Sequence, residues 1–268
     1  MCRALVVSRS GYYRFVTRHP CQRQQHHIEL QHKVRDMFVH FKKRYGAPRL
    51  YRALKHANVK CCLNTVATVM QELNLKARNG KAFRYSRFSH ANYHVSDNVL
   101  NRKFMASAPN QKWVSDITYL RLNGQWVYLA TVMDLYSRAI VGWHVDDHMT
   151  VSLISNALNM AILRRDVKPG IIIHSDRGVQ YRSVEYLDLI QSIGGISSMS
   201  RRSNCWDNAV MESFFSRLKV ELTFGEKYRS IPQLKSSIFE YIEIFYNRVR
   251  QHSTLGYLSP VQYEEQNA

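Results

Sequence analysis

The second half of the chain alternates apolar and polar positions in the way that predicts β-strands. This alternation begins at Gln111, and Asn123-Gly124, a dipeptide that favours a two-residue hairpin turn, interrupts it. Short apolar segments bounded by turn residues follow further along the chain. Together these segments predict strands at residues 112–121, 125–134, 139–145, 171–174 and 196–199.

Helical spacing of apolar residues appears between and after these strands. It predicts helices over residues 151–165, 183–193, 207–222 and 231–248, with Asp207 as the N-cap of the third. Three antiparallel strands followed by alternating helices and strands predict a mixed α/β fold. We therefore expect a five-stranded mixed sheet flanked by helices.

In the first part of the chain, the spacing of apolar residues predicts short helices. Apolar residues recur at helical spacing over residues 25–42 and 49–58, and again after Asn64, which we expect to cap a third helix. Three short helices with a tight break predict a small all-α, helix-turn-helix-like domain over residues 25–75. Its groove-facing residues would be Thr65, Thr68 and Gln71. The alternative is a helical bundle that docks on the core and does not touch DNA.

Positive charge is concentrated before the sheet. Residues 1–110 hold 21 lysines and arginines against 4 acidic residues, whereas residues 111–268 hold 17 against 16. This asymmetry favours a polyanion-binding module attached to a near-neutral domain. We divide the chain into an N-terminal segment (1–24), the helical domain (25–75), a basic linker (76–110), the core (111–225) and a C-terminal helix and tail (226–268).

The cysteines and the lengths of the apolar segments indicate the cellular compartment of the protein. The chain has five cysteines, an odd number, without a CxxC motif, and it has no signal peptide or long apolar run. These features predict free thiols in a reducing cytoplasm and no association with a membrane.

Three acidic residues stand out because of where the predicted elements place them. Asp116 lies within a β-rich run, Asp176 follows the apolar residues 171–173, and Glu212 lies in the first turns of a predicted helix. Asp176 alone could be a strand-end turn residue and Glu212 a solvated helix residue, but a buried, unpaired carboxylate at Asp116 would be costly. Together the three could converge on a hard divalent cation such as Mg²⁺.

This Asp, Asp, Glu series, with 35 residues between Asp176 and Glu212, resembles the catalytic core of retroviral integrases and related transposases. The flanking residues are also similar to those of the second-frame (OrfB) transposases of bacterial insertion sequences, over nearly the whole chain. The matching residues are Trp113, His174-Ser175-Asp176-Arg177-Gly178, Asp207-Asn208-Ala209, Tyr246-Asn247, Arg250, His252, Leu255-Gly256 and Ser259-Pro260.

The resemblance implies a ribonuclease-H-like core that cleaves DNA ends and transfers strands with two Mg²⁺ ions, or Mn²⁺ in their place. Asp116 would bridge both ions, and Asp176 and Glu212 would each hold one. It also implies terminal inverted repeats and target DNA as partners, a homo-oligomer in the synaptic complex, and fusion to or action with an upstream-frame helix-turn-helix protein. The location would be the bacterial cytoplasm, at the nucleoid.

Further residues near the three acids are candidates for DNA contact. Lys219 lies seven residues after Glu212, and the resemblance implies that it holds a DNA phosphate. Asn208 lies four residues before Glu212, on the same helix face. The other candidates are Arg177, Gln180, Arg201 and Arg202. His174 would either support the site or be a satisfied buried histidine, and Asp134, Asp146 and Asp147 are interpreted as turn residues.

Two alternatives to a transposase stay open from the sequence. One is a ribonuclease-H-like nuclease that only hydrolyses DNA. The other is a DNA-binding regulator derived from a transposase.

Overall fold

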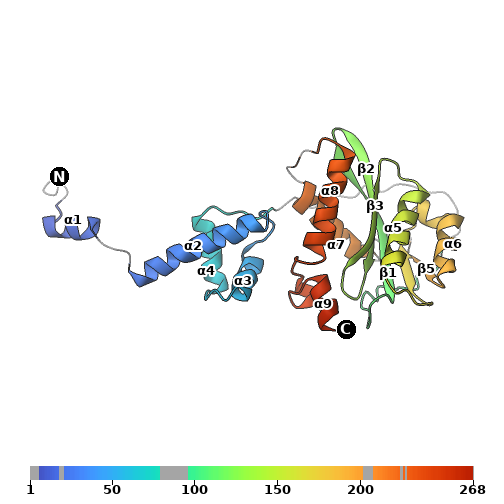
Figure 1. Ribbon diagram of the computed structural model, residues 1–268, viewed down its shortest axis with the longest axis horizontal. Helices are drawn as coiled ribbons and strands as arrows, with labels where there is room; N and C mark the ends of the chain where they lie inside the picture. Colours follow the sequence, from blue (N-terminus) through green and yellow to red (C-terminus); the bar gives the residue numbers. More distant parts are fainter. Residues whose placement is uncertain are drawn as a thin grey trace. The chain divides into compact units, whose positions relative to one another are not determined.

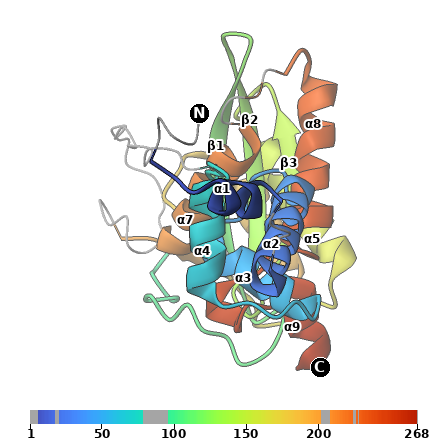
Figure 2. The ribbon, with the colours of Figure 1, turned by 90° about the vertical axis from the view of Figure 1, so that its left-hand side faces the viewer.

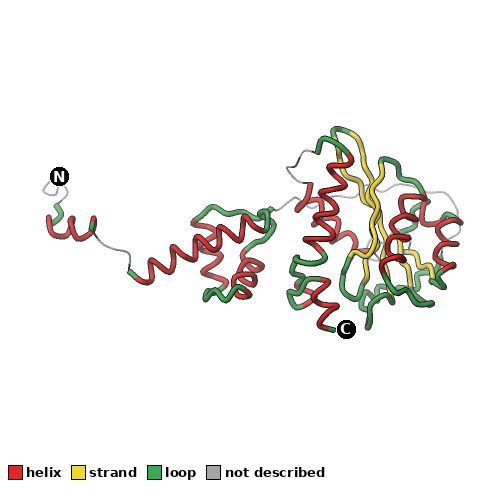
Figure 3. The backbone as a smooth tube through the Cα atoms, viewed as in Figure 1, coloured by secondary structure: helices red, strands yellow, loops and turns green. Residues whose placement is uncertain are grey.

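The computed structural model of the 268-residue chain describes residues 6–17, 21–78, 96–201, 208–223, 226 and 228–267. The chain forms two compact units, which divide after Arg78. The described residues up to Arg78 are helical and are called the helical unit; those after it contain the sheet and are called the sheet unit (Figures 1 and 3).

The helical unit contains α1 (Arg9–Val16), α2 (Gln22–His40), α3 (Ala47–His56) and α4 (Leu63–Glu72). The last three pack together and bury one apolar stripe each, as the spacing predicts. Pro48 lies in the first turn of α3, where its missing N–H costs nothing. The expected cap at Asn64 is wrong: α4 begins at Leu63, and Cys62, with an extended backbone, is its N-cap.

The sheet has five strands in the order β3-β2-β1-β4-β5. Its strands β1 and β2 pair antiparallel, as do β2 and β3, whereas β4 runs parallel to both β1 and β5. All five predicted strands and the mixed sheet are confirmed. The strands are β1 (Lys112–Leu122), β2 (Gln125–Asp134), β3 (Ile140–Asp146), β4 (Ile172–Ser175) and β5 (Ile196–Met199).

Helices cover both faces of this sheet (Figure 1). One face carries α5 (Val151–Arg164) and α6 (Val184–Ser192), and the other carries α7 (Ala209–Leu218) and α8 (Ile231–Phe239). Gly142 lets β3 and α5 approach closely, because a Cβ there would lie 2.1 Å from the carbonyl oxygen of Ala157. Shorter elements complete the unit: the 3₁₀ turns Gln180–Arg182 and Ser253–Leu255, and α9 (Pro260–Gln266).

Two predicted helices change type before they end. The helix expected over 207–222 is α-helical only to Leu218 and continues as the π-helix Lys219–Thr223. The helix expected over 231–248 becomes the π-helix Glu240–Tyr246. Apolar periodicity does not separate these forms over so few residues, because both leave an apolar stripe on one side. The N-cap of α7 is Asn208, and Asp207 lies outside the described residues.

None of the helices in the described part of the chain combines the length and the apolar character needed to cross a bilayer.

Candidate active site

Two neighbouring parallel strands bring the first two acids level with each other. Val114 of β1 is in register with His174 of β4. Two residues further on, Asp116 continues along β1 and Asp176 directly follows the end of β4. Because parallel strands point the same way, both carboxyl groups lie at the same end of the β1–β4 pair.

Helix α7, which follows the sheet in the sequence, provides the third acid. Glu212 lies in its first turn, and α7 packs against β1. Burial raises the pKa of the Asp116 carboxyl well above its usual range, and the charges of Asp176 and Glu212 raise it further. The Ile117 N–H, 2.8 Å from Asp116 Oδ1, and the charge of Lys219 act in the opposite direction. The structure therefore brings the three acids together, with Asp116 at the centre.

The other two carboxyl groups are also perturbed. Surrounding protein atoms raise the pKa of Asp176, although the Gly178 N–H, 2.8 Å from its Oδ1, and the charge of Arg182 oppose the shift. Burial likewise raises the pKa of Glu212. The raised pKa values mean that ionising these three carboxyl groups costs free energy. A bound divalent cation would lower this cost, because its positive charge favours the ionised carboxylates.

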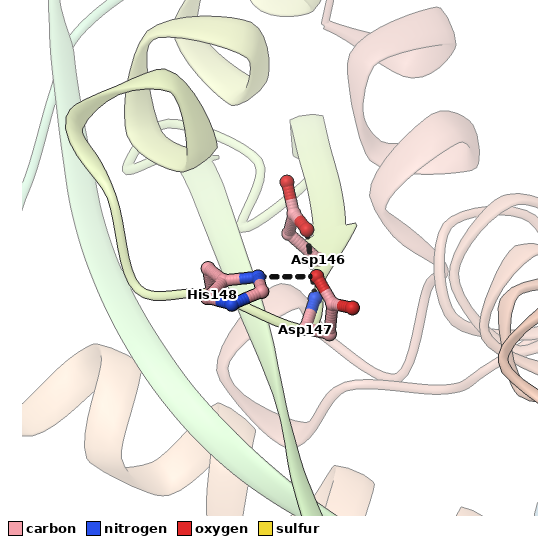
Figure 4. A group of neighbouring side chains, drawn as sticks. All are labelled: Asp146, Asp147 and His148. Atoms are coloured by element: carbon pink, nitrogen blue, oxygen red, sulfur yellow. Dashed lines mark hydrogen bonds and ion pairs between the residues drawn. The ribbon is translucent and has the colours of Figure 1, made fainter.

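A different group of possible ligands is more tightly spaced. Among the described residues, Asp146, Asp147 and His148 alone have ligand atoms within 4.8 Å of one another (Figure 4). The Asp147 N–H donates to Asp146 Oδ1 at 2.7 Å, and His148 Nδ1 lies 2.7 Å from Asp147 Oδ1. These contacts, at the end of β3, agree with the predicted turn. The three acids are accordingly spaced more widely than this group.

Lys219 lies beside the acids, at the junction of α7 and its π-helical continuation. Its side chain is buried, with 7% of the residue exposed, and Nζ lies 4.4 Å from the centroid of the Tyr119 ring. Burial lowers the pKa of Lys219 to about 8, although the charge of Asp116 acts to raise it. The lysine is thus part of the acidic cluster, not a solvated surface residue.

Three of the DNA-contact candidates in the sheet unit have partners within the protein. Arg177 Nε donates to the Ser200 carbonyl at 2.6 Å and so joins the ends of β4 and β5. Gln180 Nε2 donates to the Met149 carbonyl at 3.1 Å. Arg201 Nη2, which is exposed, lies 3.4 Å from Asn101 Oδ1.

The remaining candidates differ in exposure. Asn208 is buried at the start of α7, and Arg202 lies outside the described residues. In the helical unit, Thr68 and Gln71 are exposed on α4, and Thr65 is half-buried. The hydroxyl of Thr65 lies 3.0 Å from Cys62 Sγ, and that of Thr68 donates to the Asn64 carbonyl at 3.0 Å.

His174 is a satisfied buried histidine. It is fully enclosed, and its two ring nitrogens lie 2.9 Å from Ser198 Oγ and 3.1 Å from Ser200 Oγ. These contacts fasten β4 to β5 next to Asp176. Asp134 is the last residue of β2 and not a turn residue, and its carboxylate accepts the backbone N–H groups of Asn110 and Tyr136 in the segments next to the strand end.

Two supporting groups were not predicted from the sequence. Under the acids, the buried hydroxyl of Tyr181 lies 3.1 Å from Ser115 Oγ; burial mainly, then Tyr186, Asp116 and Asp176, raise the pKa of Tyr181. A polar Ser115 at an inward position of a strand was the available signal. The second group is Glu221, in the π-helical continuation of α7, with its buried partners Arg250 and Tyr241.

Comparison with known proteins finds matching family models and similar chains. Residues 106–205 and 212–267 each match a model of the integrase core domain, and residues 25–83 match an HTH-like domain. Among solved structures, a chain of the simian T-cell lymphotropic virus intasome is 15% identical with a TM-score of 0.49, covering 81% of this chain and 74% of that one. The catalytic core of HTLV-2 integrase in complex with magnesium is 16% identical with a TM-score of 0.44, covering 59% of this chain and 98% of that one.

Curated relatives match along the whole chain. Transposase InsF for insertion sequence IS3A of Escherichia coli K12 is 42% identical over 269 residues, covering 100% of this chain and 93% of the relative. An uncharacterized 31 kDa protein of insertion element IS600 from Shigella sonnei is 38% identical over 265 residues, covering 99% and 97%. With an integrase core, a preceding HTH-like domain and this identity throughout, the chain belongs to the IS3 family of insertion-sequence transposases.

Proposed function

We propose that this transposase cleaves the ends of an insertion sequence and transfers them to target DNA, with Asp116, Asp176 and Glu212 holding two divalent metal ions. The observation that carries the proposal is the meeting of three carboxyl groups from β1, the end of β4 and α7, each with a raised pKa.

The donor set fits Mg²⁺, which selects carboxylate oxygens, and Mn²⁺, which accepts the same ligands. Asp116 suits the bridging position because the charges of both Asp176 and Glu212 raise its pKa. When bound, such a pair of ions would activate the attacking oxygen and stabilise the leaving oxygen of an in-line displacement at phosphorus.

The remaining residues of the proposal bind and orient DNA. Lys219, beside Asp116, supplies a positive charge for a phosphate next to the reacting one. Thr65, Thr68 and Gln71 of α4 face base edges, and the basic residues of the first 110 positions neutralise phosphates. Additional contacts are assigned to Asn208, Arg177, Gln180, Arg201 and Arg202.

The partners follow from this chemistry. They are the terminal inverted repeats of the element and the target DNA, in a complex that joins two ends and therefore needs at least two copies of the chain. An upstream-frame helix-turn-helix protein, fused to this chain or acting with it, would supply further DNA recognition. We place the protein in the bacterial cytoplasm, at the nucleoid, with residues 25–75 as the DNA-binding domain and residues 111–225 as the core.

Incubation of the purified chain with a terminal-repeat duplex and a target plasmid tests the proposal. In Mg²⁺ or Mn²⁺ we expect nicked ends followed by joined products, and in EDTA neither. Nicks without joined products would instead indicate a nuclease, and bound but uncut DNA would indicate a regulator. Either result overturns the proposal.

A further inference from the structure

The β1–β2 hairpin extends past the strand that flanks it. Strand β1 pairs with β4 only at residues 112–114, so the rest of β1 lies beyond that partner. The hairpin turns at Asn123-Gly124, both with positive φ, and rises at the top of the sheet unit in Figure 2. Asn123 Nδ2 donates to the Arg229 carbonyl at 3.2 Å, which fastens the tip to the chain before α8. The hairpin therefore extends beyond Asp116, away from the acids, and is held at its tip by the chain before α8.

A continuous row of rings and cations runs from the acids along this hairpin. It starts with Lys219 Nζ over the Tyr119 ring. Tyr119 meets Trp126 edge to face, with centroids 5.1 Å apart and an interplanar angle of 84°. Arg121 Cζ then lies 5.4 Å from the centroid of the Trp126 ring. We call Tyr119, Arg121 and Trp126 the hairpin platform.

Trp126 is a large aromatic residue on a strand and is nevertheless exposed. Of its surface, 45% is exposed, and Arg121, its register partner on β1, is exposed as well. A cross-strand cation–π pair stabilises a hairpin modestly, by up to about 1 kcal/mol, and does not require an open indole surface. Exposed aromatic rings next to basic side chains are the combination that proteins use to hold unstacked bases and their phosphates.

We propose that the hairpin platform binds the DNA strand that runs through the active site, with an unpaired base stacked on Trp126 and a neighbouring phosphate held by Arg121. This inference rests on the proposed function, because the platform joins the acids through Lys219 and Tyr119. Lys219 and Arg121 place positive charge at both ends of the row, which suits a polyanion.

The strand register sets which nucleotide would be bound. Arg121 lies five residues beyond Asp116 on β1, which is about 17 Å along the strand at 3.4 Å per residue. Because five is an odd number, the two side chains leave opposite faces of β1, and Lys219, close to both Asp116 and Tyr119, links the acids to the platform. One DNA strand advances about 3.4 Å per nucleotide. The platform should therefore contact a base about five nucleotides from the reacting phosphate.

Photocrosslinking locates this contact directly. Terminal-repeat duplexes would carry 5-iodouracil at single positions roughly two to nine nucleotides from the reacting phosphate, each position either paired or left unpaired by a mismatch. After irradiation with the full-length chain, we expect the adduct to be strongest about five nucleotides from that phosphate, on a peptide containing Trp126. Adducts confined to peptides outside the hairpin platform would overturn the inference.

Affinity provides the second measurement. Stacking of one base contributes about 5- to 150-fold in Kd, so Trp126→Thr should raise the Kd for the mismatched duplex about fivefold or more. Trp126→Phe keeps a ring and should stay near the wild type. The control is Ile196→Thr, because Ile196 is also a strand residue and its exposed fraction, 44%, matches that of Trp126. Ile196 lies on β5 in register with Ile172, which pairs with Lys112 at the start of β1 and so lies away from the hairpin tip.

The outcomes separate this inference from the proposed function. A Trp126→Thr variant that binds mismatched DNA within about twofold of the wild type, while the wild type still joins DNA ends, overturns the platform alone. A wild type that fails to cut or join overturns the proposed function. If Trp126→Thr melts at a lower temperature than the wild type, Trp126→Phe and the position of the crosslink decide.

Discussion

Asp116 is the residue at which stability and function conflict most directly. Its carboxyl group is placed against two other acids, and the surrounding protein removes much of the water that would solvate its charge. Without a cation, ionising this group costs free energy that Lys219 and the Ile117 N–H partly offset. Perturbed acids of this kind are typical of functional sites.

We predict that Asp116→Asn raises the melting temperature of the metal-free protein at neutral pH. The pKa of Asp116 is raised in the folded state, so its contribution to stability is full below the ordinary carboxyl pKa and falls as pH rises through the raised value. The asparagine keeps the oxygen that accepts from Ile117 but carries no charge.

Differential scanning calorimetry in EDTA at several pH values checks this prediction. The gain should be a few degrees at neutral pH and shrink as the pH falls to about 4. Mg²⁺ should then stabilise the wild type more than the variant, because only the wild type keeps all three acids. A variant that melts below the wild type throughout this range would contradict the argument.

A second residue-scale prediction separates chemistry from affinity. Asp176→Asn should abolish both nicking and joining, yet leave the DNA Kd within about twofold, because phosphate contacts from the basic region supply the affinity. The asparagine oxygen still accepts the Gly178 N–H, so the local turn should persist. Cleavage assays paired with fluorescence anisotropy at one salt concentration measure the two properties, and a parallel loss of both would count against this division.

Among the elements, α7 with its π-helical continuation matters most, because α7 carries Glu212 and the continuation begins with Lys219. Its π-helical continuation brings Glu221 inward, where Oε1 lies 2.8 Å from Arg250 Nη2 and Oε2 accepts the Tyr241 hydroxyl at 2.9 Å. Both Glu221 and Arg250 are almost completely buried. The C-terminal part of the chain thereby holds the end of the helix that presents two functional side chains.

Removing one partner of this buried pair should be costly. We predict that Arg250→Met destabilises the protein by about 3–5 kcal/mol, since it leaves Glu221 buried without its counter-charge. Arg164→Met is the matched control: Arg164 pairs with Glu243 at 2.6 Å but is 41% exposed, so its loss should cost about 1 kcal/mol or less. Urea unfolding measures both changes.

A second substitution tests the cause of this loss. Glu221→Gln added to Arg250→Met should recover part of the stability, because the uncompensated charge is then absent. Equal losses for Arg250→Met and Arg164→Met would show that burial of the ion pair has no special effect.

Local patterns predicted the elements well and the junctions between them less well. Alternation and the Asn123-Gly124 turn identified the strands, because strand and hairpin preferences are local. The cap of α4 was missed because capping follows backbone conformation, which is extended at Cys62. The π-helical segments were missed because apolar spacing does not separate a π-helix from an α-helix over so few residues.

The site was predictable only in part for the same reason. Asp116 and Asp176 meet because β1 and β4 are parallel neighbours, a pairing that no local pattern specifies. The resemblance to integrases supplied that juxtaposition. It did not indicate that Lys219 would be buried against Tyr119, since that contact depends on how α7 packs against β1.

For the whole molecule, the uneven distribution of charge indicates that the first 110 residues provide most of the DNA affinity and the rest provides the catalytic core. Residues 1–110 carry a net charge of +17 and residues 111–268 a net charge of +1. Phosphate neutralisation releases counterions, so a basic region gives affinity that falls steeply with salt and does not depend on sequence. Discrimination between DNA sequences must come from side chains that reach base edges.

The exposed residues of the helical unit allow these two contributions to be separated. Lys60 lies exposed just before α4, and Gln71 lies exposed on the helix itself. We predict that Lys60→Gln weakens binding to all DNA sequences equally and reduces the slope of log K against log salt by about 1. Gln71→Ala should leave that slope unchanged but reduce the preference for the terminal repeat by about 1–3 kcal/mol. Titrations of repeat and scrambled duplexes at several salt concentrations distinguish them, and a Gln71→Ala variant that keeps its full preference would show that this position of α4 does not read bases.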